Sequence, residues 1–171
     1  METEELIELK EEARGARGIG VTMAITAAIL ALVTMMGHRL HTEEVVMQTK
    51  SADGWSYFQA KNNRYHMYAN DAKLAELTGA AAAAPVVADW TKKAEEERKQ
   101  AGDVQKENEQ LDRETEATAR RATFFDVSEI CLEIGIVLCS IALLTSAAMF
   151  WRTSFVPIVL GMAIAIYGLV T

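Results

Sequence analysis

Three acidic residues near the start of an apolar segment are the residues of this chain best placed to do chemistry. Asp126, Glu129 and Glu133 follow one another at spacings of three and four, so they share one face of a helix. Glu133 lies about two turns inside the apolar segment, where a carboxylate must be paired, hydrated or protonated. In an oligomer such a row could bind or pass cations, or relay protons. Alternatively, Glu129 lies at headgroup depth and pairs with Arg120 or Arg121 of a neighbouring copy, while Glu133 forms a hydrogen bond across helices.

Enzyme motifs are absent from the sequence. It contains no glycine-rich phosphate loop, no HExxH and no GxSxG, so we expect no enzymatic activity, no cofactor and no metal. His38 and His41 could form half a metal site, but we expect a solvated pair. Cys131 and Cys139 lie eight residues apart on one predicted helix, too far to form a disulfide. The net charge of −7, with basic residues alternating with acidic ones, disfavours nucleic-acid binding.

Apolar residues are concentrated in three segments, residues 19–37, 127–150 and 155–171. The first carries no charge, and its length at about 1.5 Å per residue matches a hydrocarbon core of about 30 Å. A cleaved signal peptide is disfavoured because residues 1–18 contain six glutamates, whereas the start of a signal peptide is basic. We therefore predict three transmembrane helices after an amphipathic N-terminal segment (1–18), with residues 151–154 joining the last two.

Residues 38–126 are highly charged and predict a long extramembrane hairpin. Gly79 and Pro85 are the only strong turn signals near its centre, and they place the turn at residues 78–85. Each arm would then have roughly forty residues and be about 60 Å long. Equal arms return the chain to the membrane that it left. The predicted fold class is thus all-α and integral to the membrane, with an antiparallel, coiled-coil-like helical hairpin.

Each arm shows the spacing of one helical face. In the first arm this face comprises Val45, Ala52, Trp55, Phe58, Tyr65, Tyr68, Ala72 and Ala75. In the second arm a four-three repeat comprises Trp90, Ala94, Glu97, Ala101, Val104, Asn108, Leu111, Thr115, Thr118, Ala122 and Phe125, and it continues to Glu129. The second face is polar for a coiled coil, so a charged helix in solvent is the alternative.

An aromatic cluster occupies the middle of the first arm. Its members are Trp55, Tyr57, Phe58, Tyr65 and Tyr68. They lie far from the headgroup level of a membrane aromatic belt, so we expect them to pack against the second arm or a neighbouring subunit. We also expect Gln59 and Lys61 to form hydrogen bonds with carboxylates of the opposing helix, which would lock the two arms together. The alternative is a recognition patch for another protein.

The segment Trp55–Lys61, WSYFQAK, follows a predicted transmembrane helix and precedes a long helix. This arrangement resembles the signature of a family of bacterial membrane proteins, domain-of-unknown-function family 4337. The Phe-Phe-Asp that ends at Asp126, the segment 136–145 and a glycine-containing third span are similar too. The resemblance implies the three-span topology but no activity, because the family has no established biochemical function.

These features together lead us to expect a homo-oligomer in a lipid bilayer, acting as a scaffold or as a subunit of a larger membrane complex. A channel that uses Glu129 and Glu133 is the alternative. The implied location is a bacterial inner membrane. Basic residues are nearly balanced across the predicted spans, with a slight preference for a cytoplasmic N-terminus and a periplasmic hairpin.

Overall fold

A computed structural model describes the backbone of residues 2–79 and 83–170, and the side chains from Arg14 onward within those ranges. The chain forms three helices, α1 (Glu2–Leu77), α2 (Ala84–Thr145) and α3 (Ala148–Val170), and the described residues contain no strand. The predicted all-α class is therefore confirmed. The amphipathic face predicted within 1–18 depends largely on side chains that lie outside the described residues.

Each of the three helices contains a stretch that is long and apolar enough to cross a membrane. This is compatible with a multi-pass membrane protein. Contacts divide the chain into two compact units, one made of Met1–Glu43 and Thr118–Thr171 and the other of Glu44–Ala117. We call them the three-helix unit and the hairpin unit. α1 and α2 each contribute residues to both.

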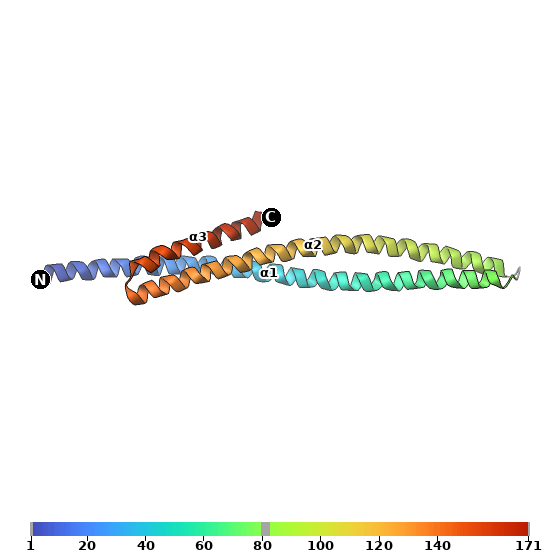
Figure 1. Ribbon diagram of the computed structural model, residues 1–171, viewed down its shortest axis with the longest axis horizontal. Coiled ribbons are helices and arrows are strands. Elements are labelled where there is room, and N and C mark those ends of the chain that lie inside the picture. Colours follow the sequence, from blue (N-terminus) through green and yellow to red (C-terminus); the bar gives the residue numbers. More distant parts are fainter. Residues whose placement is uncertain (1, 80–82, 171) are drawn as a thin grey trace. The chain divides into compact units, whose positions relative to one another are not determined.

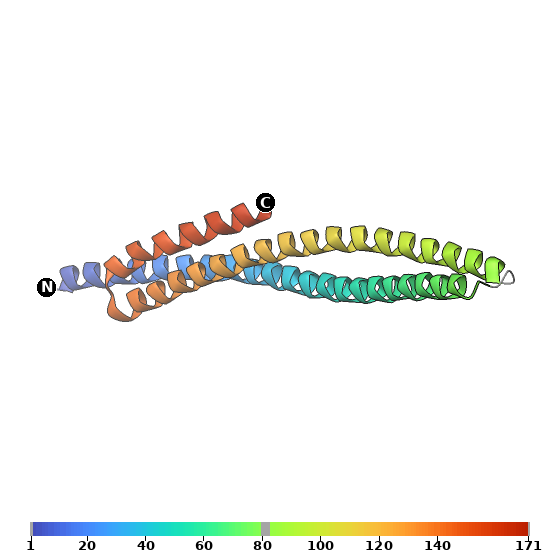
Figure 2. The ribbon, with the colours of Figure 1, turned by 45° about the vertical axis from the view of Figure 1, so that its right-hand side comes forward.

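In the three-helix unit, α3 turns back after α2 and runs beside it, and the N-terminal part of α1 packs against them (Figures 1 and 2). Two apolar clusters form its interior. One is centred on Phe125, Leu132 and Ile158, and the other on Ile19, Cys139 and Ala142. Many apolar side chains also remain on the surface of this unit, for example Ile25, Leu32 and Val137, each more than half exposed.

The turn between α2 and α3 corrects one prediction. α2 ends at Thr145 and α3 begins at Ala148, so residues 151–154 lie within α3 and the break predicted there is wrong. Ser146 has φ 51°, a left-handed conformation that ends α2. No glycine or proline marks this turn in the sequence. The polar residues around Arg152 led to the prediction of a break at 151–154 instead. Because α3 begins at Ala148, Pro157 lies inside this helix.

In the hairpin unit, α1 and α2 lie side by side and run in opposite directions (Figures 1 and 2). α1 ends at Leu77, and Gly79 has φ 64°, which a residue without a side chain adopts at little cost. α2 starts at Ala84 and places Pro85 in its first turn, where the missing N–H costs little. These positions agree with the predicted turn at residues 78–85.

The predicted face of α2 is confirmed, because every position of the repeat from Trp90 to Phe125 is buried or half-buried. On α1 the predicted face is confirmed from Trp55 to Ala75 but wrong before it. Val45 and Ala52 are exposed, and Met47 and Ser51 are shielded instead. The interface there is made of small and polar residues, which a search for apolar spacing passes over.

Candidate functional site

Asp126 is the first residue of the predicted carboxylate row and lies in the three-helix unit. The Nε2 atom of His41, on α1, lies 3.1 Å from each carboxylate oxygen of Asp126. Both side chains are about half exposed, at 49% for His41 and 47% for Asp126. His41 therefore contacts a carboxylate of the facing helix, which the spacing of the two histidines did not predict. His38 is exposed.

Glu129 lies one turn further along α2 and has a partner within the same chain. The hydroxyl of Thr34 donates a hydrogen bond of 2.9 Å to Oε1 of Glu129, and the carboxylate is half-buried. Within the same chain, the Nε of Arg121 lies 3.4 Å from the backbone oxygen of Gly168 near the end of α3. The predicted pairing of Glu129 with Arg120 or Arg121 of a neighbouring copy stays a prediction. α1 thus holds Glu129, and Thr34 is a partner that the sequence analysis missed.

Glu133 differs from the other two acids because its side chain is exposed. Its neighbours on α2 include Ile130, Ile134 and Val137, which are 55%, 48% and 56% exposed. A carboxylate on such an apolar surface needs water, a proton or a polar partner if the surface faces lipid. The three acids share a helical face, but only Asp126 and Glu129 are held by α1.

α3 packs on α2 through small residues. A Cβ atom added to Gly161 would lie 3.0 Å from the Cβ of Cys131 and 3.0 Å from the oxygen of Ser128. Ser128 donates a hydrogen bond of 2.8 Å to the backbone oxygen of Gly161, and the thiol of Cys139 lies 3.2 Å from Oγ of Ser154. Both cysteines are free thiols. The close approach of the two helices leaves little space between them.

A polar layer joins the two helices of the hairpin unit. Asn108 is only 4% exposed, and its Nδ2 donates a hydrogen bond of 3.0 Å to the backbone oxygen of Ser51. The hydroxyl of Ser51 bonds to Asp112, and Nε1 of Trp55 donates to Oδ2 of the same aspartate at 3.1 Å. Sequence reasoning placed Trp55 and Asn108 at the interface but missed Ser51 and Asp112, which are polar residues beside the expected apolar positions.

A second polar contact in the hairpin unit is a shielded ion pair. Lys61 is 7% exposed, and its Nζ lies 3.1 Å from Oε2 of Glu97, while Arg64 approaches the other carboxylate oxygen at 3.7 Å. Oε2 has no aligned hydrogen-bond donor, so the contact is an ion pair without directed hydrogen bonding. Lys61 therefore faces a carboxylate of the opposing helix as predicted, but the contact is an ion pair and not the predicted hydrogen bond. Gln59, expected to do the same, is exposed.

The predicted aromatic cluster packs within the hairpin. The rings of Trp55 and Phe58 meet edge to face at 5.6 Å, and Arg98 of α2 lies 5.7 Å from the ring centre of Tyr65. Tyr57 differs because it is about half exposed, with the ammonium of Lys61 5.4 Å from its ring centre. Most of the cluster therefore fastens one arm to the other, and Tyr57 faces outward.

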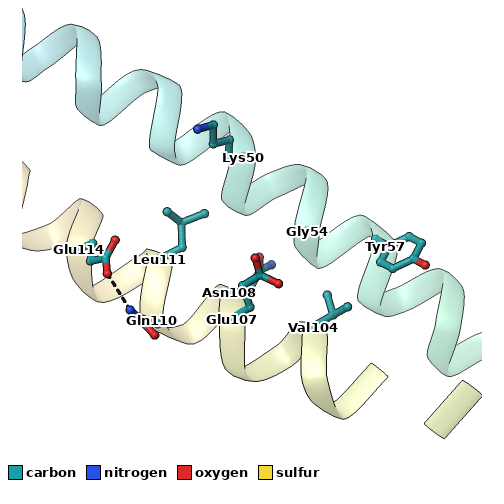
Figure 3. A pocket seen from close by; sticks show the side chains of 9 residues that line it. All are labelled: Lys50, Gly54, Tyr57, Val104, Glu107, Asn108, Gln110, Leu111 and Glu114. Carbon is teal, nitrogen blue, oxygen red and sulfur yellow. Dashed lines mark hydrogen bonds between the residues drawn. The ribbon is translucent and has the colours of Figure 1, made fainter. Parts of the chain in front are cut away.

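A groove runs along one side of the hairpin unit between α1 and α2 (Figure 3). Figure 3 shows Leu111 and Asn108 reaching from α2 towards α1, with Lys50 and Tyr57 on the facing helix. Gly54 and Asn108 both line the groove, and the side chain of Asn108 fills the space that a Cβ atom at position 54 would need. The full lining is Lys50, Gly54, Tyr57, Val104, Glu107, Asn108, Gln110, Leu111 and Glu114.

Metal ligands do not gather in the part of the chain that the structure describes. Within that part, no three histidine, cysteine or acidic side chains lie close enough together to hold a metal ion. The Asp126–His41 pair would supply two ligands at most.

Comparison with known proteins adds a family but no function. No curated protein and no solved structure matches the chain. The match that covers the chain is to a family described as "Domain of unknown function (DUF4337)", over residues 15–171. This span takes in the apolar segments of all three helices and the whole hairpin unit. The chain belongs to this family.

Proposed function

We propose that this protein is a non-enzymatic membrane scaffold, or an accessory subunit of a larger membrane complex, that oligomerises through its hairpin and its membrane helices. In this proposal the apolar parts of the three helices cross the bilayer and the hairpin unit stands outside it. Exposed apolar residues of the three-helix unit, such as Leu32 and Val137, then meet lipid. The inner membrane of a bacterium is the proposed location, with the hairpin in the periplasm.

The observation that carries the proposal is the interior of the hairpin unit. Asn108 bonds to the backbone of Ser51, and Lys61 pairs with Glu97, so the two helices are aligned at two separate levels. Polar contacts that are buried between helices favour one register, since any slip leaves them unpaired. A hairpin with a fixed register suits a structural role, because it presents its outer side chains at constant positions to a partner.

The test is the mass of the protein extracted from its own membrane into native nanodiscs and read by native mass spectrometry. Whole-number multiples of 18.8 kDa above one would support a homo-oligomeric scaffold. Additional unlike chains in fixed ratio would support the accessory-subunit form of the proposal. A single chain with no protein partner would contradict both.

Glu133 favours a second candidate function, an oligomeric ion or proton channel. It is an exposed carboxylate on an otherwise apolar surface of α2, with the half-buried Glu129 one turn away. Copies of the chain that turned these faces towards each other would surround a carboxylate-lined path. The half-exposed Asp126 would lie at the entrance of that path.

Flux measurements separate the two candidates. Proteoliposomes are loaded with a pH-sensitive or a cation-sensitive dye, and the wild type is compared with Glu133→Gln and Glu129→Gln. A channel predicts that both variants lose flux while the mass of the assembly is unchanged. Glu95→Gln, on the exposed surface of the hairpin unit, is the matched control. Absence of flux in the wild type would exclude the channel, and loss of the oligomer in Glu129→Gln would assign that residue a structural role.

A further inference from the structure

The two sides of the hairpin unit are closed to different degrees. On one side, the side chain of Trp55 on α1 reaches α2, where its Nε1 donates a hydrogen bond to Asp112. On the other side, the amide of Asn108 packs against Gly54, and the groove of Figure 3 lies over these two residues. The half-buried side chains of Val104 and Leu111 form the apolar part of this groove. The groove is therefore a partly apolar surface that the chain's own hairpin does not cover.

The rims of the groove carry opposite charges. Lys50 lies on the α1 rim, and Glu107 and Glu114 lie on the α2 rim. Among the described residues Lys50 forms no ion pair, and Glu114 accepts only a hydrogen bond of 2.9 Å from Gln110 of its own helix. One wall of the groove thus offers an unpaired ammonium, and the other offers carboxylates.

These groups also lie at matching heights along the hairpin. The contacts of Ser51 with Asp112 and of Gly54 with Asn108 show which residues of α1 and α2 face each other. By that alignment Lys50 is within two residues of the height of Glu114, which is about 3 Å along a helix. Tyr57 has the same relation to Glu107. Seven residues separate the two groups on each rim, so the heights match at both ends of the groove.

We infer that this groove is where a second copy of the chain docks, with the two hairpins parallel and related by a two-fold axis along their length. Such a rotation places α1 of one copy over α2 of the other. Lys50 then meets the partner's Glu114, and the hydroxyl of Tyr57 meets the partner's Glu107. Each of these pairs forms twice, because a two-fold interface uses the same surface on both copies.

A second copy fits this surface better than an unlike protein, because the surface is complementary to itself. A uniformly charged groove would repel its own copy, whereas a groove with one basic rim and one acidic rim attracts it. The parallel arrangement rests on the proposed function, since copies inserted into one membrane share an orientation. The result is a four-helix arrangement in which Val104 and Leu111 are covered.

Site-directed cross-linking tests the inference in membranes. Two differently tagged full-length chains are co-expressed, one with Lys50→Cys and the other with Glu114→Cys, in a background where Cys131 and Cys139 are replaced by alanine. Mild oxidation is expected to yield the mixed disulfide dimer. The matched control is Gln59→Cys with Gln105→Cys. Both are exposed. Gln59 lies two residues after Tyr57 and Gln105 lies two residues before Glu107, so each points about 200° around its helix from that groove residue.

The outcomes distinguish this inference from the proposed function. Cross-linking of the groove pair but not of the control pair supports docking at the groove. Equal cross-linking of both pairs, or of neither, overturns it. If neither pair cross-links but native mass spectrometry finds a homo-oligomer, the scaffold proposal stands and only the assigned face is wrong. A monomer by mass would remove the scaffold proposal as well.

A charge exchange provides a second test without cysteines. Lys50→Glu places like charges at both copies of the contact and is expected to weaken dimerisation in detergent by about tenfold. Combining Lys50→Glu with Glu114→Lys restores opposite charges and is expected to restore the dimer. Both residues are exposed, so neither change should unfold the hairpin. Equal dimerisation of the wild type and Lys50→Glu, or no rescue by the double variant, would contradict the inference.

Discussion

The two units of this chain fasten their helices by different physical means. α3 packs on α2 through Gly135, Gly161 and Gly168, where an added Cβ atom would meet the facing helix. The hairpin unit uses polar side chains, with Asn108 bonded to Ser51 and Lys61 paired with Glu97. In lipid, apolar burial does not drive helices together, so close fit must do so. In water, polar pairs add register to an interface that apolar burial also stabilises. The difference matches the placement that we propose for the two units.

The largest effect is expected from filling the close contact of α2 with α3. Gly161→Leu needs space where a Cβ atom would already lie 3.0 Å from Cys131 and Ser128 and 3.1 Å from Leu132. We expect a loss of about 3 kcal/mol in the free energy of unfolding, from overpacking. Thermal unfolding in detergent, followed by circular dichroism, measures it. Gly20→Leu is the control, because no atom lies within 4 Å of its added Cβ. An equal loss in the two variants would contradict the tight interface.

The next effect concerns the shielded ion pair of the hairpin unit. Lys61→Met leaves the carboxylate of Glu97, whose side chain is 16% exposed, without its nearest cation. We expect a loss of about 2 kcal/mol, below the value for a fully buried pair because Arg64 remains nearby. Adding Glu97→Leu should recover most of the stability, since no charge is then left without a partner. If the double variant were less stable than Lys61→Met, the pair would not be the cause.

Two glycines of the hairpin unit should respond with opposite signs. Gly54→Ala forces Asn108 out of its place and breaks its bond to Ser51, which we expect to cost about 1 kcal/mol after the gain in helix propensity. Gly102→Ala meets nothing within 4 Å and should stabilise the helix by up to about 1 kcal/mol. Chemical denaturation of both variants gives the two signs. Stabilisation by Gly54→Ala would show that Asn108 moves aside freely.

The smallest effect is expected at an exposed ion pair of the same unit. A hydrogen bond from Lys93 to Asp89, 2.7 Å long, raises the pKa of Lys93 above its ordinary value of 10.5. A raised lysine pKa stabilises the fold below pH 10.5 and loses that contribution as the pH rises through the higher value. The pair is solvent-exposed, so Lys93→Met should leave the melting temperature at neutral pH unchanged. A decrease as large as that of Lys61→Met would remove the distinction between exposed and shielded pairs.

The sequence predicts the hairpin better than it predicts the turn between α2 and α3 or the polar contacts between helices. The four-three repeat of α2 is confirmed from Trp90 to Phe125, because the period holds even where Glu97 and Asn108 replace apolar residues. On α1 the same search fails at Val45 and Ala52, where the interface is formed by Ser51 and Gly54. Such residues show their role only when the partner helix is present.

The turn after α2 and the partners of the acidic row were beyond sequence reasoning for a related reason. Ser146 and Ala147 are compatible with a continuing helix, so nothing marks the left-handed residue that ends it. Spacing placed Asp126, Glu129 and Glu133 on one face correctly. It could not reveal that Thr34 and His41 hold two of them and leave Glu133 outward, because those contacts join residues more than eighty positions apart.

The contact of Gly54 with Asn108 has a consequence for the descent of these proteins. The amide of Asn108 occupies the volume that a side chain at position 54 would need. We therefore expect a larger residue at position 54 to be tolerated only together with a smaller residue at position 108. Among members of the family, these two positions should vary together more than either varies with its sequence neighbours. An alignment of family sequences would show this covariation without any further structure.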